Sequence, residues 1–289
     1  MIETWTRGDA VGGMDEAILA ATGPIVARHP WWRARARLTL ALLRQAGIRP
    51  PMSVLDAGCG WGVTLDHLER AGYACTGLDV SRRALRLIDR PGRRLVEADL
   101  TVDQPINVPT YDAVLALDVI EHLDDDAGAV ARLARLVRPG GVLILSVPAL
   151  PELYSEFDAI QGHRRRYTAE TLRSAVGGPG LLLDSIRGWG GLLVPIVRRQ
   201  RRRPLGLAGE SPEVTYGRYL RLPSTLARLA LKLAFLAEHA LALSLPGRSG
   251  TSLFAVVLQG GPTQPTIDAA RSTTQMRSAS ATAKVGRSR

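Results

Sequence analysis

The sequence has few cysteines, lysines and aromatic residues. Only Lys232 and Lys284 are lysines among 37 Lys plus Arg residues, and aromatic residues make up 5% of the 289 positions. The two cysteines, Cys59 and Cys75, are too few for a disulfide framework and lack the spacing of a metal site. These absences exclude a cysteine-bound zinc ion and indicate a reducing compartment.

A long uncharged apolar run is also missing. Arg228, Lys232 and Glu238 interrupt the best candidate, whereas a membrane-spanning helix needs roughly 18 uncharged apolar residues. Glu3 and Asp9 precede any apolar run, which is the wrong charge order for a secretory signal. We therefore expect a cytoplasmic protein that does not cross a membrane.

The remaining composition is that of a globular chain. Hydrophobic residues make up 46% and charged residues 22%, which excludes collagen, coiled coils and wholesale disorder. The formal net charge of +10 comes almost entirely from arginine, whose planar guanidinium suits phosphates and carboxylates.

The chain changes character along its length, and we divide it into five segments. They are an N-terminal helical segment (1–49), a regular core (50–189), a helical insert (190–251), a last core strand (252–260) and a basic tail (261–289). The tail is rich in Ser, Thr and Ala and is predicted to be disordered, because it has too little apolar surface to bury.

Short apolar runs alternate with helical patterns in the core segment. The strand candidates are Ser53–Asp56, Ala74–Leu78, Arg94–Glu97, Ala113–Leu117 and Val142–Val147. The helix candidates are Val63–Ala71, Arg82–Asp89 and Asp126–Leu136, and Pro139-Gly140-Gly141 forms a turn before the fifth strand. This alternation predicts a doubly wound α/β sheet of largely parallel strands.

A glycine-rich loop follows the first of these strands. Its glycines, Gly58, Gly60 and Gly62, run as G-x-G-x-G and lack the G-x-G-x-x-G spacing of dinucleotide sites. The acidic Asp56 just before them is poorly placed for a pyrophosphate, so a cationic ligand fits better. Asp79 ends the next strand, where a carboxylate can accept both hydroxyls of a ribose.

A third acid, Asp99, ends the following strand. With this order of motifs the sequence resembles the class I S-adenosylmethionine-dependent methyltransferases over about residues 50–189, and 252–258 resembles their last, antiparallel strand. The resemblance implies a seven-stranded Rossmann-like methyltransferase sheet with an α-helical insert before the last strand. It also implies that S-adenosylmethionine is the cofactor, held by Asp56, Gly58, Gly60, Gly62, Asp79, Asp99, Leu100 and Asp118.

The fourth strand ends in Asp118, Glu121 and His122, which places two carboxylates and an imidazole at the sheet edge where ligands bind. This segment resembles the ubiquinone and menaquinone-biosynthesis type of methyltransferase, some of whose members hold a divalent ion there. We interpret Glu121 and His122 as groups that cap or orient the next loop and predict no metal, with a metal site as the alternative. His122 is a candidate base.

A basic box follows the fifth strand. His163-Arg164-Arg165-Arg166-Tyr167 resembles a His-x-Arg-Arg-Tyr box found in a subgroup of bacterial methyltransferases. His163 and Asp158 are the other candidate catalytic residues, and Arg165, Arg166 and Tyr167 are predicted to bind a substrate. The alternative is that the arginines pair structurally with acids such as Asp158, while Thr168 caps a helix beginning near Ala169.

The first segment contains His29-Pro30-Trp31-Trp32, which leads into a helix through Arg33, Arg35 and Arg37. By its resemblance to the same subgroup this helix is a lid over the cofactor. The alternative is that the tryptophans are packing anchors.

The insert combines apolar and basic residues. Five arginines in six positions, 198–203, adjoin an apolar run, and a helix predicted over roughly 222–245 has a wide apolar face with a narrow basic stripe. Such a helix is typical of an anionic membrane interface, although ordinary core packing and a dimer interface are alternatives.

Together these patterns predict an S-adenosylmethionine-dependent methyltransferase that methylates an oxygen of a small, lipid-linked or natural-product acceptor. We expect it in the cytoplasm, with peripheral attachment at the inner membrane face, and we expect no nucleic-acid partner. The alternatives are a non-catalytic, membrane-associated scaffold with this fold and an RNA methyltransferase.

Overall fold

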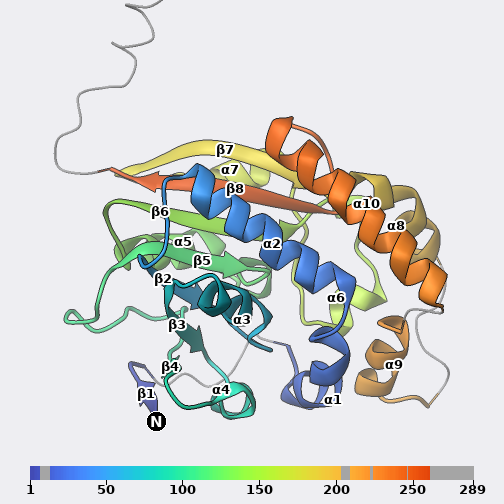
Figure 1. Cartoon of the computed structure of the whole chain (residues 1–289), viewed down its shortest axis with the longest axis horizontal. Coiled ribbons are helices and arrows are strands. Elements are labelled where there is room, and N and C mark those ends of the chain that lie inside the picture. The colour runs from blue at the N-terminus through green and yellow to red at the C-terminus, as the bar shows by residue number, and fades with distance from the viewer. Residues whose placement is uncertain (7–13, 203–208, 222–223, 246, 261–289) are drawn as a thin grey trace, which may run out of the picture.

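A computed structural model describes residues 1–6, 14–202, 209–221, 224–245 and 247–260. An eight-stranded sheet runs through its centre in the order β1-β4-β3-β2-β5-β6-β8-β7 (Figure 1). From one edge to the other the strands are Ile2–Thr4, Arg94–Glu97, Ala74–Asp79, Ser53–Ala57, Tyr111–Leu117, Val137–Pro148, Ser252–Gln259 and Leu181–Trp189. The predicted basic tail and Arg203 lie outside the described residues.

Strand direction follows the predicted pattern. β8 runs antiparallel to both of its neighbours, β6 and β7, whereas the other neighbouring strands pair in parallel. The predicted Rossmann-like fold with a helical insert before the last strand is therefore confirmed. The sheet has one strand more than the predicted seven, since Ile2–Thr4 pairs with β4 at the edge.

Helices cover both faces of the sheet, as a parallel sheet requires. α5 (Asp126–Arg135) and α7 (Ala169–Ala175) pack on one face, and α2 (Pro30–Gln45), α3 (Val63–Arg70) and α10 (Thr225–Ser244) pack on the other. The remaining helices are α1 (Glu16–Val26), α4 (Arg82–Ile88), α6 (Glu156–Ile160), α8 (Val194–Arg201) and α9 (Pro212–Tyr219), with short 3-10 turns at Ile120–His122, Pro151–Leu153 and Gly191–Leu193.

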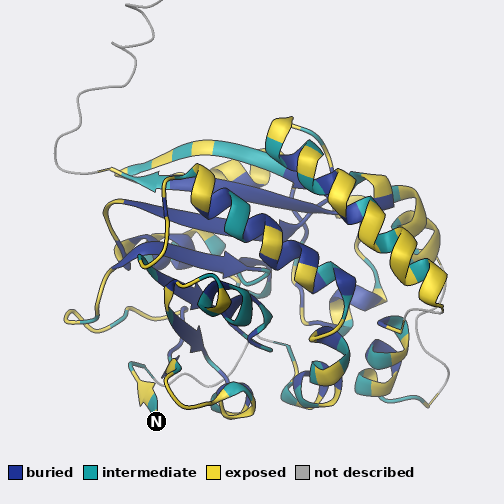
Figure 2. Cartoon of the chain, viewed as in Figure 1, coloured by how far each residue is buried: buried dark blue, intermediate teal, exposed yellow. Residues whose placement is uncertain are grey.

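β5 shows why the central strands have continuous apolar sequences. Ala113, Leu115 and Leu117 point into the core beneath α2 and α3, whereas Val114 and Ala116 point into the core beneath α5. All seven of its residues are buried, and the one acid among them, Asp112, accepts hydrogen bonds from Ser53 at 2.7 Å (Figure 2). Apolar side chains on both faces make this strand recognisable as a short unbroken run.

Two strands differ from the expected pattern. The first half of β7 alternates half-buried and exposed residues at the sheet edge, and its Asp184 and Arg187 break up the apolar run that marks the other strands. In β6, Pro139-Gly140-Gly141 forms an irregular start to the strand: Tyr111 pairs with Val137, and the register then shifts so that Ala113 pairs with Val142.

The insert forms three helices, α8, α9 and α10, between β7 and β8. α10 packs against α2 and β7 through a cluster of rings, in which Trp189 lies 4.4 Å from Trp31 and 5.2 Å from Phe235 between ring centroids. One side of α10 therefore packs in the core, which was the alternative to a membrane interface for this helix. The other side faces outward (Figure 2). None of the described helices is both long enough and apolar enough to span a bilayer.

We predict that Trp189→Ala lowers the free energy of unfolding by about 3–5 kcal/mol, because it leaves a cavity where α2, β7 and α10 meet. Leu182→Ala, on the same strand at a position 61% exposed, is the control and should change it by less than about 0.5 kcal/mol. Denaturant unfolding measures both. Equal effects of the two substitutions would contradict this packing.

Candidate active site

One cavity of about 1150 Å³ lies at the carboxyl ends of the parallel strands. It receives side chains from the strand ends, from the segment after β6, from α1 and α2, and from all three helices of the insert. Segments that are far apart in the sequence thus share one cavity. Of the predicted site residues, those lining it are Gly58, Gly60, Asp79, Asp99, Leu100, Asp118, His122, His163 and Arg166.

The glycine loop begins at Gly58, which has φ +73° and whose N–H donates to the Leu78 carbonyl at 2.7 Å. A Cβ at this position would lie 2.4 Å from a methyl carbon of Val119. Glycine is therefore required both by the backbone conformation and by the close approach. Gly62 differs from Gly58 and Gly60, because it caps the start of α3.

Asp79 is fixed by the same loop. Its carboxylate accepts hydrogen bonds from the backbone N–H groups of Gly60 and Ser81, each at 2.9 Å. Burial raises its pKa, and these two bonds oppose that effect. The side chain is thus held rigidly at the end of β3.

Asp56 lies on β2 beneath the loop and is only 3% exposed. It is not among the residues that line the cavity. Burial raises its pKa to about 7, while the charge of Arg35 opposes the increase. A buried acid of this kind would be stabilised by a positively charged group close to it.

Asp99 and Leu100 follow β4. One oxygen of Asp99 accepts hydrogen bonds from the backbone N–H and the hydroxyl of Thr101, both at 2.7 Å. These bonds fix the turn after the strand and leave Leu100 against the cavity.

Asp118 directly follows β5 and has a left-handed conformation, with φ +57°. Ser146 donates a hydrogen bond to one of its oxygens at 2.7 Å, and Arg35 forms an ion pair with the other. The partner Arg35 lies on α2, 83 residues away in the sequence. Sequence reasoning did not identify Arg35 as a site residue, although it lies in the arginine-rich helix that follows the two tryptophans.

That helix begins at His29, whose Nδ1 accepts the Trp31 backbone N–H at 3.2 Å and caps its first turn. Trp31 and Trp32 line the cavity and also pack on other aromatic rings, Trp31 on Trp189 and Trp32 on Trp61. The packing-anchor interpretation therefore holds for both tryptophans, on the wall of the cavity.

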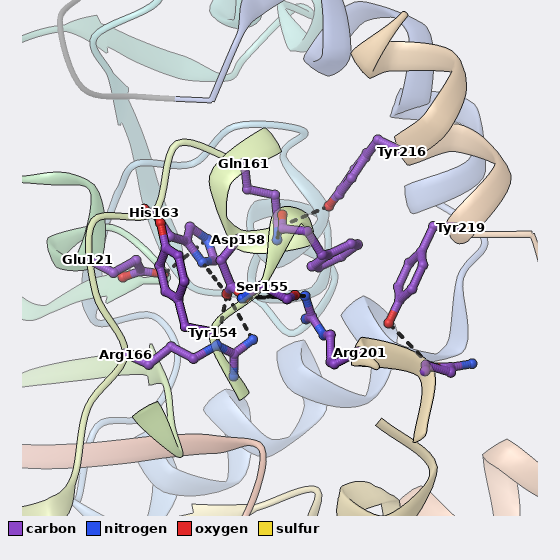
Figure 3. A network of polar contacts seen from close by, with 12 residues as sticks. Glu121, Tyr154, Ser155, Asp158, Gln161, His163, Arg166, Arg201, Tyr216 and Tyr219 are labelled. Atoms are coloured by element: carbon purple, nitrogen blue, oxygen red, sulfur yellow. Dashed lines mark hydrogen bonds and ion pairs between the residues drawn. The ribbon is translucent and has the colours of Figure 1, made fainter. Parts of the chain in front are cut away.

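A buried network surrounds Asp158 (Figure 3). Its carboxylate lies 3.0 Å from Nδ1 of His163 and accepts hydrogen bonds from Arg166 at 2.8 Å and Arg201 at 3.2 Å. Burial alone would raise the pKa of Asp158, but the bond to His163 and the two guanidinium charges outweigh burial and lower it to about 2. Asp158 is thus an ionised partner of His163.

Glu121 and His122 lie beside His163. Both Glu121 oxygens and Nδ1 of His122 are buried and have no hydrogen-bond partner among the residues that the structure describes. Burial, followed by the neighbouring His163, lowers the pKa of His122 to about 4, and burial raises that of Glu121. One ligand atom from each of these three residues lies within 4.8 Å of the others, close enough to hold a metal ion.

The basic box divides between two directions. Arg166 reaches the cavity, and it also donates to the Ala149 carbonyl at 2.8 Å. Arg165 and Tyr167 turn toward the start of α5, where both contact Asp126, at 3.3 Å and 2.7 Å. Thr168 caps α7 through reciprocal hydrogen bonds with Thr171. Arg165 therefore pairs with an acid and Thr168 caps a helix, as the structural alternative predicts.

The insert contributes residues that sequence reasoning did not assign to the site. Arg201 of α8 lies over the Phe157 ring, 4.0 Å from its centroid, and Tyr216 of α9 donates to Gln161 at 3.1 Å. All four residues line the cavity. Only the folded chain brings them together, since no local motif connects α8 and α9 with the segment after β6.

The sequence is similar to known methyltransferases. Residues 31–185, more than half of the chain, match a family model described as a methyltransferase domain. The ubiquinone biosynthesis O-methyltransferase of Alkalilimnicola ehrlichii is 38% identical over 99 residues, which are 32% of this chain and 40% of that protein. The protein of the same name from Thiobacillus denitrificans is 29% identical over 136 residues, 41% of this chain and 57% of that protein.

These curated relatives are matched over only about half of their length. Among solved structures, a Haloferax volcanii methyltransferase in complex with the Trm112 activator has a TM-score of 0.56 and 17% identity. That match covers 86% of this chain and 97% of the other. Likeness at this identity shows the fold alone. The extent of the family match decides the classification: the chain belongs to the S-adenosylmethionine-dependent methyltransferases, as the order of its motifs predicts.

Proposed function

We propose that this chain transfers a methyl group from S-adenosylmethionine to an oxygen atom of a small acceptor that carries an apolar part. The observation that supports it most directly is a single cavity in which the glycine loop and strand-end acids face the His163–Asp158 pair. The O-methyltransferase names of the curated relatives agree with oxygen as the acceptor atom.

The donor side of the cavity has the features that the cofactor needs. A Cβ at Gly58 would clash with Val119, so the loop backbone stays free of side chains there, and we propose that the buried acid Asp56 beneath it attracts the ammonium group of the cofactor. We propose that Asp79 holds the ribose hydroxyls, that Asp99 and Leu100 bind the adenine edge, and that Gly60 and Gly62 shape the loop. The bound cofactor supplies a methyl group already activated on a sulfonium.

Asp118 lies between the donor and acceptor sides. Because Arg35 and Ser146 fix both of its oxygens, it cannot rotate freely toward either side. We propose that it forms the wall against which the reacting groups are aligned. Alignment and exclusion of water are the main contributions a methyltransferase makes.

On the acceptor side, His163 is the proposed base. Asp158 accepts from His163 Nδ1 and stays ionised. The other ring nitrogen, Nε2, lies 3.9 Å from an oxygen of the buried Glu121, and we propose that it removes the proton from an acceptor hydroxyl. Asp158 therefore positions His163 and does not itself take the proton. His122 is uncharged at neutral pH and packs edge-on against His163, which makes it the alternative base.

We propose two kinds of role on the acceptor side for residues of the basic box: a direct one for Arg166, and an indirect one for Arg165 and Tyr167. Arg166 lines the cavity and fixes Asp158. Arg165 and Tyr167 anchor the segment that carries His163 to α5, so their effect on an acceptor is indirect.

An apolar arm of the same cavity supports a lipid-linked or otherwise amphipathic acceptor. Leu193, Val197, Leu231 and Phe235 line it, from the 3-10 turn after β7, α8 and α10. Binding in this arm would remove a chain of methylene or isoprene groups from water. This burial contributes a favourable free energy of roughly 25 cal/mol per Å² of apolar surface.

The outer side of the insert supports attachment to an anionic membrane. Leu226, Leu229, Leu233 and Leu236 are 53 to 76% exposed on one side of α10. Arg198, Arg199 and Arg202 of α8 border a second, open groove. Exposed leucines on α10 and exposed arginines on α8 are the two kinds of side chain that favour a lipid surface. Arg201 does not belong to this surface, because its side chain is turned into the cavity.

We predict that Asp79→Ala weakens the binding of S-adenosylhomocysteine at least about tenfold, or 1.4 kcal/mol, because the proposed ribose contact is lost. Asp184→Ala removes an exposed acid from β7 and is the control. Calorimetric titration measures both. If the folded wild-type protein does not bind S-adenosylhomocysteine, the scaffold alternative gains support; if Asp79→Ala binds normally, the assignment of Asp79 is wrong.

We predict that His163→Gln lowers kcat by about 10²- to 10⁴-fold on any phenolic acceptor that the wild type methylates, since its general base is removed. Binding of S-adenosylhomocysteine should not change. His67→Gln on α3 is the control, because His67 is not among the cavity-lining residues. Turnover should also survive excess chelator; its loss would indicate a metal ion at Glu121, His122 and His163.

We predict that replacing Arg198, Arg199 and Arg202 with Glu abolishes sedimentation with vesicles of anionic phospholipid, and that Leu229→Ser with Leu233→Ser weakens it. A control protein with the exposed Arg49, Arg86 and Arg173 replaced by Glu has the same change in net charge on other elements. If both triple variants lose binding equally, the attraction is only general charge. Strong RNA binding with weak vesicle binding would favour the RNA methyltransferase alternative.

A further inference from the structure

We propose that Arg201 forms the recognition site for a carboxylate on the acceptor, at the end of the cavity built by α8 and α9. This inference rests on the proposed function and adds the chemical class of the acceptor. It makes the helical insert a determinant of acceptor choice as well as a surface for lipid.

The first observation is the incomplete bonding of Arg201. Its side chain is 9% exposed and lines the cavity, and one terminal nitrogen donates to Ser155 at 2.8 Å and to Asp158 at 3.2 Å. Its Nε is buried and has no hydrogen-bond partner among the described residues. An unpartnered buried guanidinium N–H is unfavourable, so an acceptor oxygen at this position would be stabilised.

Arg166 provides the comparison within the same network. Its Nε donates to Asp158 at 2.8 Å, one terminal nitrogen donates to the Ala149 carbonyl at 2.8 Å, and the other lies 2.8 Å from Asp158. All three nitrogens are therefore engaged. Arg166 is occupied with holding Asp158, whereas Arg201 retains donors that are not used.

The second observation is the balance of charge. Three guanidinium groups, those of Arg35, Arg166 and Arg201, line this part of the cavity, and the carboxylates paired with them are Asp118 and Asp158. Arg166 and Arg201 therefore share the single carboxylate of Asp158, and a second anion beside Arg201 would offset the cost of burying its charge.

The surroundings of Arg201 suit an aromatic acid (Figure 3). Phe157 and Tyr219 lie together beside the guanidinium, with ring centroids 4.0 and 5.8 Å from its central carbon and 4.2 Å from each other, and form an apolar wall. Tyr216 and Gln161 add a hydroxyl and an amide at the same end of the cavity. A planar ring with a carboxylate would contact both features, with the carboxylate gripped by two guanidinium N–H groups.

The test compares a carboxylate with its neutral isostere in the full-length protein saturated with S-adenosylhomocysteine. The probes are 3-hydroxybenzoate and 3-hydroxybenzamide, titrated by ligand-observed NMR. We expect the wild type to bind the carboxylate at least about tenfold more tightly than the amide, as a charge-assisted hydrogen bond would give.

Variants assign the preference to Arg201. Arg201→Gln should reduce the preference below about threefold, Arg201→Lys should retain part of it because the charge remains, and Arg198→Gln, the same charge change on the exposed side of α8, should leave it intact. Unchanged binding of S-adenosylhomocysteine by Arg201→Gln shows that this protein is folded.

Three results would overturn the proposal: equal binding of the two probes by the wild type, an undiminished preference in Arg201→Gln, or carboxylate binding that is seen in a parallel titration without S-adenosylhomocysteine and is lost when S-adenosylhomocysteine saturates the site. The last result would indicate that the guanidinium of Arg201 binds the carboxylate of the cofactor and not one on the acceptor. If the wild type does not bind S-adenosylhomocysteine, the proposed function fails instead, which keeps the two failures distinct.

Discussion

The buried carboxylate of Asp158 is the interaction on which the acceptor side of the molecule depends. Its side chain has no solvent exposure, and it would be strongly unfavourable there without partners. The hydrogen bonds and charges that surround it come from the segment after β6 and from α8 of the insert. One buried charge therefore connects the candidate base, the basic box and the insert, and removing any partner would leave the others uncompensated.

The donor side is built by a different principle. There the strand ends of a parallel sheet place Asp56, Asp79, Asp99 and Asp118 along one edge, and the last three are fixed by the turn that follows or by a neighbouring strand or helix. These residues need no long-range partner to be brought together, apart from Arg35 at Asp118. The backbone topology alone brings them to the cavity.

This contrast explains how far the sequence could predict the structure. The donor side could be predicted because its acids and glycines follow short apolar runs in a fixed order. The continuous runs of β2 to β6 were recognisable because both of their faces are buried, whereas the half-exposed β7 and the three-residue β1 have no such signal. Leu181–Trp189 and Ile2–Thr4 are strands because of their neighbours in the sheet.

The acceptor side could be predicted only in part, for the same physical reason. His163, Asp158 and Arg166 are close in sequence, so their grouping was visible. Arg35, Arg201 and Tyr216 reach the cavity from α2, α8 and α9, and nothing in the local sequence distinguishes Arg201 from Arg198 or Arg202. Only their burial in the folded chain distinguishes them: the side chain of Arg198 is 50% exposed, whereas that of Arg201 is 9% exposed.

The two sides of the insert are therefore linked by geometry. Leu231 and Phe235 of α10 line the cavity, and Leu229, Leu233 and Leu236 of the same helix are exposed on its outer side. α8 likewise turns Arg201 inward and Arg198 outward. Because a rigid helix cannot move one face without moving the other, a lipid surface that binds the outer leucines would also bear on the apolar arm of the cavity. The proposed attachment to a membrane and the proposed choice of an amphipathic acceptor thus depend on the same two helices.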